Sequence, residues 1–352
     1  HIMKETVVSG IRSTGNLHLG NYYGALRNFV RMQEENNCLF FIADLHALTT
    51  HPDPTMLHEN VRNILSEYLA AGIDPEQATI FIQSDVPEIP ELYLLLNMHV
   101  GIGELMRTAS FKDKARKQLH LDQSSEEDVE KEIISDTSKH RVNAGLLTYP
   151  TLMAADIMIH KATKVPVGKD QEQHLEMTRR FCRRFNATYG VELFPEPVSY
   201  NFGQASIKVP GLDGSGKMGK SEGNCIYLID DEKTLRKKVM RAVTDEGPKV
   251  PNSPKAEPVE NLFTLLKIVS EPDVVQYFEE KYNTCEIRYG DLKKQLAEDI
   301  LKVTLPIRER ILDIRNNDEY LRRVVTIGAE KARESASRTL KEVRAIMGFK
   351  SF

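Results

Sequence analysis

The chain has 352 residues, of which 41% are hydrophobic, which is enough for one large domain and a smaller one, each with its own core. A formal net charge of −4 at pH 7 neither requires nor excludes a nucleic-acid partner. The apolar runs are too short to span a bilayer and no apolar leader follows Met3, so we expect a cytoplasmic protein. The 4 cysteines lie far apart, which argues against a zinc or iron–sulfur site.

A glycine-rich turn between a strand and a helix opens the sequence. The apolar run at 6–8 predicts a strand, and apolar residues at helical spacing over 22–32 predict a helix. A turn of this kind, here 9–21, exposes backbone N–H groups and a helix N-terminus to an anion. His18 and Asn21, at the mouth of the helix, can both donate a hydrogen bond to a phosphate oxygen. The alternative is an ordinary strand-to-helix turn in which Asn21 only caps the helix.

Apolar runs then alternate with helical patterns, which is typical of βαβ units and a parallel sheet. We predict further strands over 38–43, 78–82 and 165–167, and helices over 54–71, 89–106, 151–159 and 168–185. Residues 112–141 break the pattern, because they are strongly charged and poor in apolar residues, and predict an exposed loop or a loosely held helix pair.

The sequence becomes almost wholly helical after a short predicted strand at 226–228. Helical apolar spacing recurs over 257–269, 273–282, 289–315 and 318–347. The fold class is therefore α/β: a Rossmann-like parallel-sheet domain followed by an α-helical bundle.

A second chemical motif, Lys-Met-Gly-Lys-Ser, stands at 217–221, far from the first. Alone it could be an ordinary flexible basic loop. A His-Leu-Gly-Asn turn near the N-terminus together with such a lysine loop resembles the signature pair of the class I aminoacyl-tRNA synthetases. The pair is far more specific than either half.

Amino-acid activation needs no nucleophile from the protein, because the substrate carboxylate attacks the α-phosphate of ATP and pyrophosphate leaves. Catalysis is then positioning and stabilisation of phosphate charge. We expect His18 and Asn21 to bind phosphate oxygens. Lys217 and Lys220, helped by the hydroxyl of Ser221, are suited to follow charge onto the departing pyrophosphate.

Longer segments are similar to the bacterial tryptophanyl-tRNA synthetases. These are 9–26, 149–157 (Tyr-Pro-x-Leu-Met-Ala-Ala-Asp-Ile) and 165–174 (Val-Pro-Val-Gly-x-Asp-Gln-x-Gln-His). The resemblance extends over most of the chain. It implies a catalytic domain over 3–228, a helical anticodon-binding domain over 229–352 and a homodimer. It also implies that tryptophan, ATP and Mg²⁺ give tryptophanyl-adenylate, and that the tryptophanyl group passes to the 3′ adenosine of tRNA(Trp).

In that family the acid matching Asp156 accepts the indole N–H. A buried acid paired by the ligand's donor rejects an analogue that lacks the donor. The alternatives are a buried acid satisfied by backbone amides and, for Met153, a plain core side chain. The resemblance assigns tryptophan binding to Asp156, Met153, Tyr149, Gln171, His46, Gly10, Val8 and Val167.

The resemblance also assigns ATP binding along three stretches of the chain. The residues are Arg12, Ser13, Thr14, Gly20, Asn21, Gly168, Lys169, Asp170, Ile207, Lys217, Met218, Gly219, Lys220 and Ser221. Arg12, Lys169 and Gly219 depart from the usual family pattern. They keep open a paralogue that senses tryptophan or binds RNA without aminoacylation, and the nearer alternative is a tyrosyl-tRNA synthetase.

A tRNA partner needs only a local basic face. Basic residues cluster at 179–180, 183–184, 233–241 and 322–323. Most such clusters are solvated helix faces.

Overall fold

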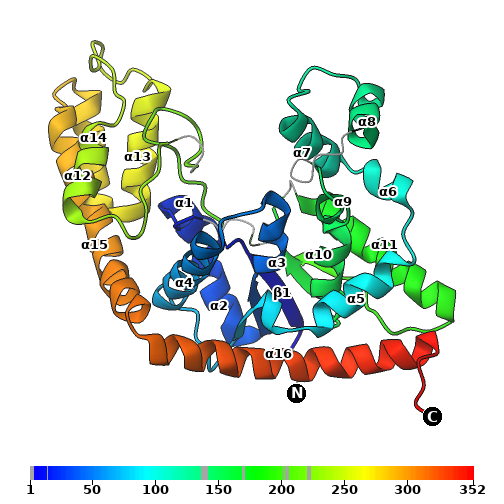
Figure 1. The fold of residues 1–352 in the computed structure, drawn as a ribbon. Coiled ribbons are helices and arrows are strands. Elements are labelled where there is room, and N and C mark those ends of the chain that lie inside the picture. Colours follow the sequence, from blue (N-terminus) through cyan, green and yellow to red (C-terminus); the bar gives the residue numbers. More distant parts are fainter. Residues whose placement is uncertain are drawn as a thin grey trace.

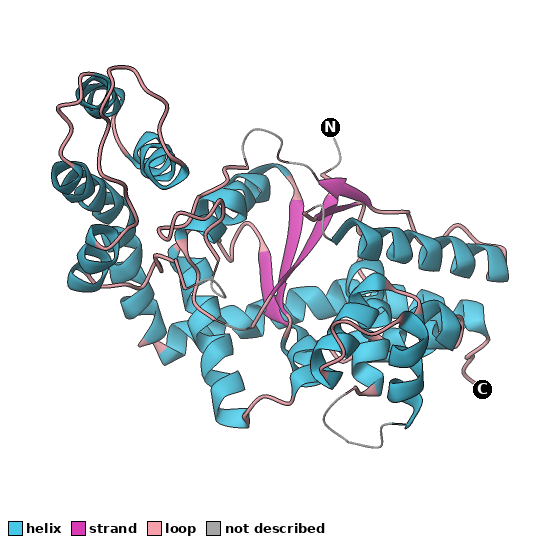
Figure 2. Ribbon diagram, turned by 90° about the horizontal axis from the view of Figure 1, so that it is seen from above, coloured by secondary structure: helices cyan, strands magenta, loops and turns pink. Residues whose placement is uncertain are grey.

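The computed structural model describes residues 4–13, 15–135, 142–168, 171–200, 202, 206–219 and 223–352. At its centre is a 5-stranded sheet of order β3-β2-β1-β4-β5 in which each neighbouring pair is parallel. Figure 2 shows these strands side by side with helices around them. The strands are β1 (Thr6–Ile11), β2 (Asn37–Ile42), β3 (Thr79–Ile82), β4 (Lys164–Pro166) and β5 (Val198–Tyr200). The predicted α/β class with a parallel sheet is confirmed.

Helices follow the strands and then continue without strands to the end of the chain. Up to the last strand they are α1 (Leu19–Asn21), the π-helical turn η1 (Tyr22–Leu26), α2 (Arg27–Glu35), α3 (Asp44–Ala47), η2 (Leu48–Thr50), α4 (Pro54–Ala70), η3 (Gln83–Asp85), α5 (Glu88–Asn97), α6 (Ile102–Met106), α7 (Ala109–Leu119), α8 (Glu126–Ser135), α9 (Ala144–Leu147), α10 (Tyr149–Met158) and α11 (Glu172–Tyr189). After β5 they are α12 (Glu232–Met240), α13 (Glu257–Val269), α14 (Pro272–Asn283), α15 (Tyr289–Arg315) and α16 (Asp318–Met347). None of the helices in the described ranges is long and apolar enough to cross a membrane.

The sheet separates two apolar cores, because successive side chains of a strand point to opposite faces. In β2, Phe40 and Ile42 pack with residues of α2, α4 and α15, whereas Leu39 and Phe41 pack with α5, α10 and α11. A strand covered on both faces is apolar at every position, which explains why its sequence is a continuous apolar run.

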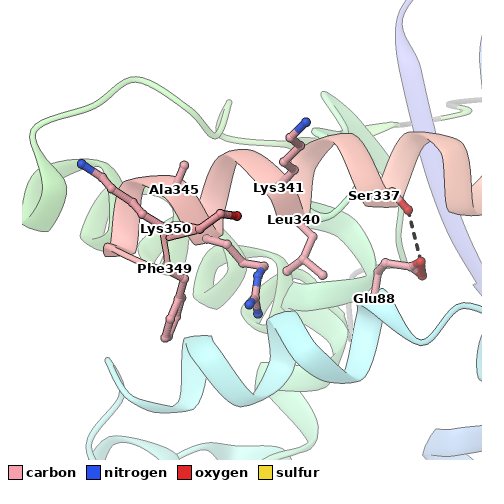
Figure 3. A pocket seen from close by; sticks show the side chains of 9 residues that line it. Glu88, Ser337, Leu340, Lys341, Ala345, Phe349 and Lys350 are labelled. Atoms are coloured by element: carbon pink, nitrogen blue, oxygen red, sulfur yellow. Dashed lines mark hydrogen bonds between the residues drawn. The ribbon is translucent and has the colours of Figure 1, made fainter.

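The last helix runs beneath the sheet and ties the C-terminal part of the chain to β3 and α5 (Figure 1). Gly328 of α16 lies against β3, so that an added Cβ would stand 1.8 Å from the carbonyl oxygen of Ile80. Arg333 and Ser337 donate to the buried Glu88 of α5 at 2.9 and 3.2 Å; Figure 3 draws the second bond. The surface hollow beside this contact has a volume of about 650 Å³.

Three predicted elements are wrong in detail. Residues 226–228 form no strand; Tyr227 makes one isolated antiparallel bridge to His18, and a turn offers no further residues to extend the ladder. The predicted helix over 89–106 is two helices, since α5 ends at Asn97 and Gly101, with extended backbone, caps α6. The predicted helix over 168–185 begins later, at α11.

Elements that were not predicted include β5, α12 and the short helices α3 and α9. β5 has only 3 residues, too few for an alternation pattern to be seen. Of the two alternatives for 112–141, the structure shows the helix pair, α7 and α8, in its described part.

We predict that Gly328→Ala lowers the free energy of unfolding by about 2–4 kcal/mol, because a methyl group cannot fit against the backbone of β3 without moving α16. Urea denaturation measures this. Gly290→Ala is the control: it lies exposed in α15, nothing stands within 4 Å of its added Cβ, and alanine favours a helix by up to about 1 kcal/mol. Equal effects of the two substitutions would contradict this packing of α16.

Candidate functional site

A cavity opens at the carboxyl end of β1, between β1 and β4. The sheet order changes direction here, since the chain builds β2 and β3 on one side of β1 and β4 on the other. Crevices at such points are where α/β folds bind ligands. The cavity has a volume of about 150 Å³ and is lined by Val8, Ser9, Gly10, Ile11, Arg12, Phe41, Ala43, His46, Lys114, Tyr149, Met153, Ile157, Val165, Pro166, Val167, Gln171 and His174. The larger hollow beside α16 shares no lining residue with it.

Most residues predicted for one substrate pocket meet in this cavity. They come from β1, α3, α10, the end of β4 and the start of α11, and are Val8, Gly10, His46, Tyr149, Met153, Val167 and Gln171. Arg12, predicted for the nucleotide, lines the same space. Met153 is therefore a wall residue and not only a core side chain.

The predicted acid, Asp156, lies behind this wall. Its side chain is 0% exposed, and Oδ2 lies 3.0 Å from Nε2 of His46. Gln83 donates from Nε2 to Oδ1 and Oδ2 at 2.8 and 2.9 Å. Burial raises the pKa of Asp156, and the bonds from His46 and Gln83 oppose that rise. Its partners within the described ranges are thus side chains, and Oδ1 accepts only the bond from Gln83.

His46 joins this acid to the cavity. Its ring lies 4.1 Å, between centroids, from that of Tyr149. When Nε2 donates to Asp156, Nδ1 is an acceptor. Nδ1 is buried and has no hydrogen-bond partner in the described part of the chain. The cavity wall therefore includes an imidazole ring whose orientation is set by a buried carboxylate.

Two cations line the cavity, Arg12 after β1 and Lys114 from α7. Nζ of Lys114 stands 4.2 Å from the centroid of the Tyr149 ring. Burial lowers the pKa of Lys114, and the charge of Arg12 lowers it further. Two like charges near one partly buried space make a site for an anion.

The sequence did not point to Lys114, because it stands in the charged segment 112–141. A signal was present nonetheless. Phe111, Ala115 and Leu119 are buried and recur at helical spacing, so α7 has one apolar face that fixes where its lysine points. The density of charge around these residues concealed that spacing.

The turn at His18 is closed by reciprocal hydrogen bonds. Nδ1 of His18 accepts from the backbone N–H groups of Gly20 and Asn21 at 3.0 and 3.3 Å, and Oδ1 of Asn21 accepts from the N–H of His18 at 3.0 Å. An added Cβ at Gly20 would stand 2.7 Å from the His18 ring, so this close approach requires glycine.

Burial, and after it the charge of Lys217, lowers the pKa of His18 to about 4, so the ring is neutral at pH 7. Since Nδ1 accepts, the ring proton is on Nε2. The turn therefore caps the helix, with His18 and not Asn21 as the N-cap residue, and Nε2 of His18 carries the ring's N–H donor.

Backbone hydrogen bonds join this turn to the segment that follows the lysine loop. Leu19 donates to the carbonyl of Ile226 at 3.0 Å, and Leu228 donates to the carbonyl of Leu17 at 2.9 Å. The two motifs, far apart in the sequence, are thus held on adjacent segments.

The first part of the lysine loop is folded around Asn224, which is 4% exposed. Its Oδ1 accepts from the N–H of Gly219 at 3.0 Å, and its Nδ2 donates to the carbonyl of Lys217 at 3.0 Å. Nδ2 also donates to Asp213 and Ser215, each at 2.9 Å. These bonds, with those from Ser215, lower the pKa of Asp213 to about 2. One buried amide thus shapes the loop from both sides of Met218.

The remaining predicted nucleotide residues are placed less directly. Met218 is 1% exposed and packs in the core, and Ser13 is 2% exposed with a hydroxyl that has no partner within the described ranges. Ile207 bonds through its backbone to η1, and Gly168 lies just before α11. Outside the described residues lie Thr14, Lys169, Asp170, Lys220 and Ser221. The roles assigned to all these residues stay predictions.

Sequence comparison finds a family model and full-length relatives. The model of the class I tRNA synthetases for tryptophan and tyrosine matches residues 3–304. A tryptophan–tRNA ligase of Porphyromonas gingivalis is 64% identical over 346 residues, covering 98% of this chain and 100% of the relative. A tryptophan–tRNA ligase of Rickettsia bellii is 40% identical and covers 99% of each chain.

Structure comparison gives the same picture. The tryptophanyl-tRNA synthetase of Campylobacter jejuni, crystallised with ADP and tryptophan, superposes with a TM-score of 0.84 at 31% identity, over 97% of this chain and 99% of that one. A tyrosyl-tRNA synthetase of Archaeoglobus fulgidus superposes with a TM-score of 0.58 at 18% identity, which shows a shared fold.

We predict that Asn224→Ala loosens the lysine loop, because it removes the partner of the part-buried N–H of Gly219 and of the carbonyl of Lys217, at about 1 kcal/mol for each group. Amide exchange in the peptide over 211–219 should speed up by at least about tenfold. Asn186→Ala is the matched control, since the Asn186 side chain makes hydrogen bonds to the backbone of Leu193 and Phe194 in another loop. Unchanged amide exchange over 211–219 in Asn224→Ala would refute the claim that Asn224 holds the lysine loop.

Proposed function

The chain belongs to the class I tRNA synthetases for tryptophan and tyrosine, and we propose that the cavity between β1 and β4 makes it the tryptophan-specific form. It is a tryptophan–tRNA ligase that uses ATP. The tryptophan carboxylate attacks the α-phosphate of ATP, pyrophosphate leaves, and the tryptophanyl group passes to the 3′ adenosine of tRNA(Trp). The observation that carries the proposal is the attachment of the His18 turn to the segment after the lysine loop, in a fold whose sheet also carries a partly apolar cavity at the end of β1.

The phosphates of ATP lie at the His18 turn. Nε2 of His18 and Nδ2 of Asn21 donate to oxygens of the α-phosphate as its charge grows, and neither has to change protonation to do so. Lys217 and Lys220, with Ser221, stabilise the departing pyrophosphate. Gly20 gives the turn its close approach, and the adenosine lies toward Gly168, Lys169, Asp170 and Ile207.

Arg12 and Lys114 supply the charge at the boundary between the two substrates. Both line the cavity in which the indole is to lie, and Arg12 directly follows the strand that leads to the phosphate turn. The substrate carboxylate and the α-phosphate must meet here as two anions, so positive charge on both sides lowers the repulsion between them. Ser13, Thr14, Met218 and Gly219 complete the ATP contacts.

The indole lies among Val8, Gly10, Met153 and Val167. Tyr149 and Gln171 hold the amino and carboxylate groups. The indole N–H is read by Asp156, through the lone pair of Oδ1 that the Gln83 bond leaves free.

Mg²⁺ enters this reaction with the nucleotide. Within the described ranges no group of three or more His, Cys, Asp or Glu side chains could hold a metal ion. We therefore assign the ion to the ATP phosphates, where it neutralises charge, and assign no step to a metal site built by the protein.

tRNA binding, assembly and location complete the proposal. The arginines of α11 pair with acids, as Arg183 does with Glu176 and Arg184 with Glu104, so the α11 cluster is a poor RNA site. Exposed Lys233, Lys237 and Arg241 on α12, and Arg322 and Arg323 on α16, are better candidates. We propose residues 229–352 as the anticodon-binding domain after the catalytic domain at 3–228, a homodimer, and a cytoplasmic location.

The first test is ATP–pyrophosphate exchange with Mg²⁺, run separately with tryptophan, tyrosine and phenylalanine. We expect exchange with tryptophan alone, because only the indole presents an N–H donor at the depth of Asp156. Exchange with tyrosine would support the tyrosyl enzyme and contradict the pocket assignment. Absence of exchange with all three would favour a tryptophan-sensing or RNA-binding paralogue.

A second test addresses Asp156 directly. We expect Asp156→Asn to raise KM for tryptophan by roughly a hundredfold with a smaller change in kcat, because an amide in place of the carboxylate turns its N–H₂ group toward His46 or the indole. The exposed Asp122→Asn, in the loop between α7 and α8, is the control. A normal KM for tryptophan in Asp156→Asn would remove this acid from substrate recognition.

A further inference from the structure

A buried acid lies beneath the His18 turn and has no role in the mechanism given above. Glu67, on α4, is 0% exposed. Its Oε1 accepts from the backbone N–H of Leu17 at 3.2 Å, directly before His18. The carbonyl of Leu17 is bound on the other side by Leu228. Leu17, the residue before His18, is therefore held on two sides. Glu67 of α4 binds its N–H, and Leu228, after the lysine loop, binds its carbonyl.

Stability does not explain an acid at this position. The second oxygen, Oε2, is buried and has no hydrogen-bond partner in the described part of the chain. A buried polar atom left unpaired destabilises a fold, so an apolar side chain of similar volume would serve packing better. Burial raises the pKa of Glu67 to about 7, against the opposing effects of the Leu17 amide and of Arg315.

The same acid lies next to the end of α15. Arg315, the last residue of that helix, acts on Glu67 through its charge, and its Nε and Nη2 are buried without partners within the described ranges. Arg62 of α4 donates to the carbonyl of Arg315 at 2.6 Å. Glu67 thus stands between the C-terminal helices and the turn that carries the phosphate donors.

We propose that Glu67 is a positioning residue for His18: by holding the N–H of Leu17 it fixes the turn from which His18 and Asn21 reach the phosphate. This inference rests on the proposed function. The donors act only where the α-phosphate charge develops, and their direction follows from the peptide that precedes them. Loss of the Glu67 bond leaves the buried N–H of Leu17 unpaired and frees the turn to rotate about its remaining bonds.

The test compares two substitutions in the full chain by ATP–pyrophosphate exchange with tryptophan. Glu67→Leu removes the acceptor, and we expect kcat to fall at least about tenfold while KM for ATP and for tryptophan stay within about twofold. Glu67→Gln keeps a carbonyl that can accept from Leu17, and we expect it to restore kcat to within about threefold of the unmodified chain.

Thermal unfolding separates positioning from a structural role. Because Glu67→Leu removes the unpaired Oε2 but also leaves the N–H of Leu17 unpaired, we expect its Tm to fall by no more than a few degrees, too little to account for the loss of kcat at the assay temperature. Ser66→Ala is the matched control, since Ser66 is equally buried, is adjacent on α4 and bonds only within the helix to Arg62. It should change neither kcat nor KM.

Each other outcome overturns the inference. It fails if Glu67→Leu keeps kcat within twofold, if Glu67→Gln is as slow as Glu67→Leu, or if activity in both falls only in step with Tm. Failure of the proposed function has a separate mark, which is absence of exchange in the unmodified chain. In that case amide exchange of the peptide over 15–22 tests whether Glu67 holds the His18 turn. Faster exchange in Glu67→Leu but not in Ser66→Ala supports this, and equal exchange in the two variants refutes it.

Discussion

The candidate site depends on the hydrogen bonds that join the His18 turn to the segment after the lysine loop. Leu17 and Leu19 exchange backbone hydrogen bonds with Leu228 and Ile226, and all four side chains are buried. A backbone hydrogen bond contributes only about 1 kcal/mol net, but breaking one in a dry interior leaves two unpaired groups that cost more. The apolar side chains around these bonds therefore do more than fill space, because they exclude water and so raise the free energy needed to separate the two motifs.

This attachment matters because the protein supplies no covalent nucleophile to the reaction. A serine or cysteine enzyme can tolerate some error in placing secondary groups, since its nucleophile forms a bond to the substrate. Here the acceleration comes from donors and cations that must stand where charge develops. The fold meets this demand with rigid contacts: reciprocal caps at His18 and Asn21, the amide of Asn224 in the lysine loop, and Gly328 pressed against β3.

The sequence predicted the parts of this arrangement that leave a local pattern. The strands β2 and β3 were visible because strands covered on both faces are largely apolar, and β1 was visible from its opening run at 6–8. The His18 turn and the lysine loop were visible because glycine, histidine and lysine stood at informative spacings. β5 was too short to show alternation, and the bridge at Tyr227 was read as a strand because an apolar triplet does not reveal that its partner is a turn.

The residues that the sequence could not reveal act through contacts made by the tertiary fold. Glu67 is one acid in an amphipathic helix, and nothing local distinguishes it from acids on a solvated face. Asn224 and Gln83 likewise gain their roles only when another segment reaches them. Such groups are recognised in the structure as buried polar side chains, which are costly to desolvate. Their hydrogen-bond partners, a backbone group or an acid, come from distant parts of the sequence.

Charge at the cavity adds a last constraint on how the site works. Burial, and after it the charge of Arg12, lowers the pKa of Lys114. An anion that enters between them offsets their repulsion and favours the charged lysine again. The attraction is thus largest for the most highly charged ligand and weak for a neutral zwitterion. In the mechanism that we propose, nucleotide and amino acid are therefore distinguished at this boundary by charge, whereas the apolar wall behind it distinguishes ligands by shape.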